Sequence, residues 1–195
     1  RRTPISTLFP YTTLFRSSEP RLEADEAAAG LLAGAYGGLA AQIGYCSGRN
    51  SRMNGMEYHR ASELLVAGDD LVLILGLRAD IRFDAGRPSY DGRKAKAFLI
   101  CRGQAVELYS GTLHLAPCRA REGGFRAAIV LPRGTNENFS EGDRPEGDRH
   151  GGDSLLFKQN KWMLAHPERT ILTRQGVPAA IAGPNLEIVP VGADE

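Results

Sequence analysis

The sequence predicts a mainly β fold, an antiparallel sandwich or barrel with one helix at its N-terminal end. The chain has 195 residues, enough for one domain of ordinary size. They include 23 Gly and 11 Pro, a composition that favours turns and strands over a helix bundle. Short apolar runs bounded by Gly, Asp or Pro recur about every 8–12 residues, as they do in β-sandwiches and barrels. With 42% hydrophobic and 24% charged residues, the chain is predicted to be globular.

Residues 1–17 are predicted not to belong to this fold. Residues 7–17 read TLFPYTTLFRS, which resembles the translation of a common sequencing-library adapter. A segment of this origin is not part of the native protein, and the true start of the gene is expected upstream. A signal peptide fits poorly, because Pro10 and three Thr interrupt the apolar stretch. The other interpretation is a genuine N-terminal arm anchored by its aromatic and leucine side chains.

A helical segment is expected next, over residues 18–45. Acidic residues gather at its start, where they suit the positive end of the helix dipole. Apolar residues then recur at helical spacing, at Ala28, Leu31, Leu32, Ala35 and Leu39. The pair Gly37 and Gly38 is expected to fray or break this helix.

The remaining chain, residues 46–192, is predicted to form the β-barrel. Strands are expected at the apolar runs, which are residues 71–75, 97–101, 105–109, 113–116, 127–131, 162–165 and 186–191. Several runs are continuous rather than alternating, so both faces of those strands should be covered. Residues 134–153 are polar and Gly-rich and are predicted to form a solvated surface loop, with a lid over a pocket as the alternative.

Charge, cysteines and missing motifs exclude several classes of function. Without residues 1–17 the chain has 21 basic and 23 acidic residues, a net charge of −2, so no nucleic-acid partner is expected. No apolar stretch is long enough to span a membrane. The three widely spaced cysteines suggest neither a disulfide framework nor a zinc site, so a cytoplasmic location is expected. P-loop, dinucleotide-binding, GxSxG and HExxH motifs are absent.

Two groups of polar residues carry the candidate chemistry. Glu57 and His59 flank Tyr58, so their side chains share one face of a strand. Glu63 follows four residues later and can return to the same place on the next segment. His114 lies in a second Gly-containing segment further along the chain.

These segments resemble the two sequence motifs of the cupin superfamily. In the first motif His59 and Glu63 fit the pattern, and Glu57 stands where the first His is usual. The second motif fits at Gly103, Gly111 and His114, with Tyr109 in place of Pro and Cys118 in place of Asn. The resemblance implies a single cupin-type antiparallel β-barrel, also called a double-stranded β-helix or jelly roll.

Residues 36–187 are similar to an uncharacterised bacterial family of cupin-like proteins, classed as a domain of unknown function. The similar segments include YGGLAAQIGYCSGRNSRMNGMEYHRASE, AVELYSGTLHLAPC, IVLPRGTN and NKWMLAHPE. This resemblance implies a fold but no established reaction.

A divalent metal site is expected from these residues. The predicted ligands are His59, Glu63, His114 and Glu57. Imidazoles and carboxylates from neighbouring strands suit Mn, Fe, Ni, Co or Zn. The alternative for each His is a hydrogen-bonded, partly buried imidazole. Glu57 and Glu107 are the candidate catalytic carboxylates, although Glu107 could equally pair with Lys96 or face solvent.

The resulting hypothesis is a metal-dependent isomerase, epimerase or lyase that acts on a small sugar, sugar acid or related carbonyl compound. The metal would polarise a carbonyl, and a carboxylate would move the proton on the adjacent carbon. A non-catalytic cupin that binds a small molecule and an iron-dependent dioxygenase are the alternatives. The expected partner is a small-molecule substrate, with no membrane contact, and the resemblance to cupins implies a homodimer.

Overall fold

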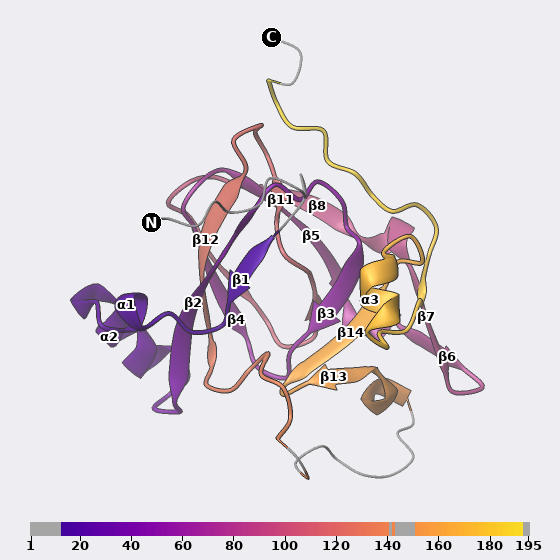
Figure 1. Ribbon diagram of the computed structural model, residues 1–195, viewed down its shortest axis with the longest axis horizontal. Coiled ribbons are helices and arrows are strands. Elements are labelled where there is room, and N and C mark those ends of the chain that lie inside the picture. The colour runs from indigo at the N-terminus through magenta and orange to yellow at the C-terminus, as the bar shows by residue number, and fades with distance from the viewer. Residues whose placement is uncertain (1–12, 141, 143–150, 193–195) are drawn as a thin grey trace, which may run out of the picture.

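Two walls of antiparallel strands enclose the interior of the molecule (Figure 1). The computed structural model describes residues 13–140, 142 and 151–192. The first wall is a five-stranded sheet in the order β1-β2-β12-β4-β9. Its strands are β1 (Leu14–Arg16), β2 (Ala41–Gly48), β12 (Phe125–Pro132), β4 (Glu63–Ala67) and β9 (Ala105–Leu108).

The second wall is built around β5 and continues into a three-stranded sheet. β5 (Leu71–Leu77) pairs with β8 (Lys96–Ile100), β10 (Thr112–Leu113) and β11 (Cys118–Arg119). The three-stranded sheet has the order β13-β14-β3, with β13 (Leu156–Lys158), β14 (Lys161–Ala165) and β3 (Gly55–Tyr58). An isolated bridge between Glu57 and His114 connects β3 to the end of β10. The predicted fold class, mainly β with antiparallel sheets arranged as a barrel, is confirmed.

Smaller elements cover one side of the barrel. They are β6 (Arg82–Asp84), β7 (Arg87–Asp91), β15 (Ile181–Ala182), α3 (Thr170–Arg174) and three short 3-10 turns, η1 (Arg78–Asp80), η2 (Gly92–Lys94) and η3 (Gly151–Leu155). The expected strand at residues 186–191 does not form. Instead Glu187 and Val191 make single bridges to Arg52 and Arg121.

The N-terminal helical segment is shorter than predicted. It consists of α1 (Pro20–Glu23) and α2 (Glu26–Ala35), which lie outside the barrel in Figure 1. Gly37 and Gly38 follow with positive φ, and β2 begins at Ala41. Residues 41–45, which were expected to be helical, therefore belong to the first wall. None of the helices in the described part of the chain is long and apolar enough to span a bilayer.

β1 runs along the edge of β2, with Phe15 opposite Cys46. A Cβ atom on Gly44 would lie 1.7 Å from the carbonyl oxygen of Arg16, so the two strands can approach only because residue 44 is a glycine. The adapter origin of residues 1–17 stays a prediction, and residues 1–12 lie outside the described residues.

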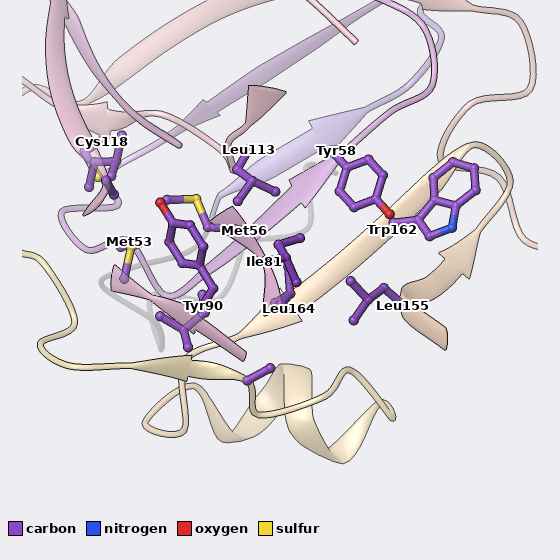
Figure 2. Packing of buried hydrophobic residues seen from close by; sticks show 14 of the residues in the cluster. Met53, Met56, Tyr58, Ile81, Tyr90, Leu113, Cys118, Leu155, Trp162 and Leu164 are labelled. Carbon is purple, nitrogen blue, oxygen red and sulfur yellow. The ribbon is translucent and has the colours of Figure 1, made fainter. Parts of the chain in front are cut away.

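Two hydrophobic clusters occupy the two sides of β5. One lies between the walls and includes Leu65, Leu73 and Ile129. The other includes Met56, Tyr58, Tyr90, Trp162 and Leu164, and Figure 2 shows its packing. Tyr58 and Trp162 stack with their ring centroids 5.5 Å apart.

Because Met56 and Tyr58 point into this second cluster, the alternating residues Glu57 and His59 face the barrel interior.

The polar segment 134–153 is only partly a solvated loop. Residues 141 and 143–150 lie outside the described residues. At its start, Thr135 and Asn136 are buried. Asn160 donates a hydrogen bond from Nδ2 to Thr135 Oγ1 at 3.0 Å, and Gln42 donates from Nε2 to the Thr135 carbonyl at 3.2 Å. These contacts fix the first residues of the segment to the barrel.

Candidate metal centre

The four predicted ligands converge in the interior of the barrel. Glu57 lies on β3 directly opposite His114, since the two residues exchange backbone hydrogen bonds of 2.6 and 2.9 Å. Directly opposite residues in a ladder point to the same side. His59 follows β3 on the same face as Glu57, and Glu63 is the first residue of β4. All four side chains are buried.

Their donor atoms lie within a few ångströms of one another. Glu63 Oε2 is 3.4 Å from Nε2 of His59 and 3.4 Å from Nε2 of His114. Glu57 Oε1 lies 3.9 Å and 4.0 Å from the same two nitrogens. Glu57, His59 and His114 each offer one ligand atom within 4.8 Å of the others. Two imidazoles and a carboxylate around one point are a donor set for first-row divalent ions.

Both imidazoles are oriented through their second nitrogen. His59 Nδ1 lies 2.7 Å from the carbonyl oxygen of Asn160, and His114 Nδ1 lies 2.9 Å from that of Thr112. A carbonyl can only accept, so each Nδ1 carries the hydrogen. In the neutral ring Nε2 then bears the free lone pair, which is the arrangement of a metal ligand.

The two Nε2 atoms are buried and make no hydrogen bond to any described residue. An unpaired polar atom in the interior is costly, and such atoms in native proteins are usually explained by a bound water or ion. Here both face the same carboxylates. The residues present therefore fit a divalent ion.

Lys161, at the start of β14, is a member of this cluster that the sequence did not indicate. Its Nζ lies 2.5 Å from Glu57 Oε2, and its side chain is only 14% exposed. Met163, two residues further on, pairs with Glu57 across β14 and β3. Lys161 shares the face of Met163 and is thus a diagonal neighbour of Glu57, within reach of a long side chain.

The pKa values of the site reflect this dense pairing of opposite charges. Burial opposes the charged forms, yet the carboxylates of Glu63 and Glu57 raise the pKa of His114 to about 9. Burial alone would raise the pKa of both glutamates, but the neighbouring positive charges lower it by more. His114 and His59 lower the pKa of Glu63, and Lys161 with the histidines lowers the pKa of Glu57. Both carboxyl groups are therefore ionised at neutral pH.

A small cavity of about 150 Å³ opens beside the cluster. Its polar lining consists of Glu57, Glu63, His114 and Lys161. The rest of its wall is formed by Phe15, Cys46, Leu115, Ala116, Pro117 and Ile129. Burial, together with the nearby glutamates, raises the pKa of the Cys46 thiol to about 12, so this group is an uncharged part of the wall.

Glu107 does not belong to the site, contrary to the prediction that it is a catalytic carboxylate. It is exposed on β9 and pairs with Leu64 of β4. Leu64 packs outward against the cluster beneath α2, whereas its neighbours Glu63 and Leu65 point inward. Opposite residues share a face, so Glu107 lies outside the barrel.

This difference gives a direct test with two matched substitutions. Glu63→Gln should lower the affinity for Co(II) by about 10- to 100-fold, because it removes a charged group beside the ion. Glu107→Gln should leave the affinity unchanged within twofold. Calorimetric titration of both variants with Co(II) measures the difference, and equal losses would contradict the placement of Glu107.

Comparison with known proteins shows partial likenesses to solved structures. Hydroxypropylphosphonic acid epoxidase from S. wedmorenis is 14% identical over 47% of this chain and 42% of its own, with a TM-score of 0.32. A cupin-2 domain protein from Shewanella frigidimarina NCIMB 400 is 15% identical over 48% and 71%, with a TM-score of 0.32. A cupin domain from Bordetella pertussis Tohama I is 11% identical over 46% and 78%, also at 0.32. The chain spans about two fifths of the epoxidase that it matches.

A search of curated protein sequences gives no match. The family model described as "Domain of unknown function (DUF4867)" matches residues 5–186, which is most of the chain and includes every residue of the candidate metal centre. The chain therefore belongs to the DUF4867 family.

Proposed function

We propose that this protein is a metal-dependent enzyme of isomerase, epimerase or lyase type that acts on a small carbonyl compound or sugar acid. The observation that carries the proposal is the pair of buried Nε2 atoms of His59 and His114, which lie beside the carboxylate of Glu63 and make no hydrogen bond to a described residue. A divalent ion at this place would supply a Lewis acid for a carbonyl oxygen.

In this proposal His59, His114 and Glu63 hold the ion, and Glu57 moves the proton. Glu57 Oε1 is further from the imidazole nitrogens than Glu63 Oε2, at 3.9 and 4.0 Å against 3.4 Å. The other oxygen of Glu57 contacts Lys161, which keeps the carboxylate ionised. Oε1 is left to face the two imidazoles. The C–H bond on the carbon next to the carbonyl breaks, and its proton passes to Oε1. The electron pair left on that carbon forms a double bond to the carbonyl carbon, and the π pair of the C=O bond moves onto the oxygen.

Exchange of that proton with solvent tests the proposal without knowledge of the final product. The full chain is first loaded with Mn(II) and its metal content is measured. It is then incubated in D₂O with three-carbon oxo and hydroxy acids, trioses and hexoses, while proton NMR follows the signal of the carbon next to the carbonyl. Loss of that signal for at least one compound is the expected result.

Glu57→Gln separates the role of base from the role of ligand. We expect this variant to keep its bound metal and to lose proton exchange by about 100-fold or more, within the range of general-base contributions. A protein that binds metal but exchanges no proton on this panel would be a binding module instead. Consumption of oxygen by the iron-loaded protein would indicate a dioxygenase, and either result would overturn the proposal.

A further inference from the structure

The cavity beside the metal centre has one cationic side chain with hydrogen-bond donors to spare. Lys161 Nζ carries three donors. Its ion-pair partner among the described residues is Glu57, whose Oε2 lies 2.5 Å away and faces one of the three donors. Two donors of a largely buried ammonium group therefore remain for a ligand in the cavity that Lys161 lines.

The charges of the buried side chains favour a ligand with one negative charge. Glu57 and Glu63 contribute two negative charges, and Lys161 contributes one positive charge. With a divalent ion and two neutral imidazole ligands, the buried site carries a net charge of +1. An uncompensated charge in a low-dielectric interior is costly. A ligand with one negative charge makes the site neutral, whereas a neutral sugar does not.

The cavity is small, and part of its wall is apolar. The volume of about 150 Å³ is that of a cavity able to hold benzene, which is about six heavy atoms. A hexose has twice that number. Ala116, Pro117 and Ile129 form an apolar wall, against which the hydroxyl groups of a sugar would lose their hydrogen bonds to water.

From these three features we infer that the ligand is a small monocarboxylate with a carbonyl or hydroxyl group on the adjacent carbon, that is, a three-carbon 2-oxo or 2-hydroxy acid. Its carboxylate accepts hydrogen bonds from Lys161 Nζ, and its short carbon chain contacts the apolar wall while the C–H bond next to the carbonyl faces Glu57 Oε1. This inference rests on the proposed function, which it narrows from carbonyl compounds and sugar acids in general to one size and charge.

Calorimetric titration of the Co(II)-loaded full chain tests the inference by binding alone. Pyruvate is compared with hydroxyacetone, which keeps the shape of pyruvate but replaces the carboxylate by a neutral group, and with glucose. We expect hydroxyacetone to bind at least about tenfold more weakly than pyruvate, because hydrogen bonds to charged groups contribute that much. Glucose should show no binding.

Two variants assign the effect to Lys161. Lys161→Met should lower the affinity for pyruvate about 10- to 100-fold and leave the affinity for hydroxyacetone unchanged. Lys96→Met, the same substitution at an exposed position on β8, should alter neither ligand. Phe15→Ala enlarges the cavity near β1 and should relax the discrimination against larger 2-oxo acids while the preference for the carboxylate persists.

Failure of the inference can be told apart from failure of the proposed function. Equal affinities for pyruvate and hydroxyacetone, unchanged pyruvate binding in Lys161→Met, or tight binding of glucose would each overturn the inference while the metal centre stands. If the protein does not bind Co(II), both fail. If Lys161→Met does not fold, the ratio of pyruvate to hydroxyacetone affinity in the unaltered chain decides alone.

Discussion

Replacing His114 by alanine should lower the affinity of the protein for Co(II) by about 100-fold or more. His114 Nε2 is buried and directed at Glu63, and the Thr112 carbonyl fixes the ring through Nδ1, so we expect Nε2 to be a direct ligand. Loss of an outer-shell partner alone costs about 10- to 100-fold in affinity, and loss of a ligand should cost at least as much. Titration followed by the visible absorption of bound Co(II) measures the change.

His166→Ala is the matched control for this substitution. His166 is also buried, but its Nε2 lies 3.0 Å from the carbonyl oxygen of Gly183 rather than beside Glu57 or Glu63. We expect this variant to bind Co(II) as the unaltered chain does once its folding has been checked by circular dichroism. Unchanged metal content in His114→Ala would refute the assigned ligand set.

The metal-free protein should lose about 3 kcal/mol of its free energy of unfolding between about pH 6.5 and pH 9. The pKa of His114 in the folded protein is about 9, above its ordinary value of about 6.5. The folded state therefore binds this proton more tightly than the unfolded chain does. The stabilisation is fully present below about pH 6.5 and disappears as the pH rises through the folded value.

The glutamates determine how the stability of the metal-free protein falls at acidic pH. The pKa of Glu63 is lowered by His114 and His59, so its contribution is present above its ordinary pKa and is lost as the pH falls below it. Urea unfolding of the metal-free chain across this pH range measures both limbs. The alkaline decline should be absent in His114→Ala, and a decline of equal size in that variant would show that another group causes it.

Bound metal should oppose the loss of stability that the metal-free protein shows as the pH rises. A divalent ion competes with the proton for His114 Nε2, so metal binding near neutral pH releases a proton and becomes tighter as the pH rises. The stabilisation by Co(II), measured as the shift in unfolding midpoint, should thus grow over the range in which the metal-free protein weakens.

Short-range patterns in the sequence predicted which polar side chains lie together in the site. Alternation along one strand puts Glu57 and His59 on one face, and that holds regardless of the rest of the fold. The motif resemblance supplied Glu63 and His114. The structure brings all four together, as the sequence predicted, and places Trp162 in the core, stacked on Tyr58.

Residues whose role depends on long-range pairing could not be found in this way. Lys161 joins the site because β14 pairs with β3, about a hundred positions earlier in the chain, in one particular register. Glu107 illustrates the opposite error. The sequence predicted the strand that carries Glu107, but the pairing of Glu107 with Leu64 decides whether its side chain faces the barrel interior or the outside. A shift of the register by one residue would turn Glu107 to the interior. The burial of Thr135 likewise depends on the distant residue Asn160.

Asn160 adopts a positive φ of 50° in the turn between β13 and β14, and its carbonyl oxygen orients His59. Its side chain also accepts a hydrogen bond from the backbone N–H of Arg60 and donates one to Thr135. If a metal ion binds here, its affinity and the order of this hairpin are thermodynamically linked, and by reciprocity each stabilises the other by the same free energy. A change in the hairpin far from the ion would alter the occupancy of the metal, and loading the metal would slow hydrogen exchange of the hairpin amides.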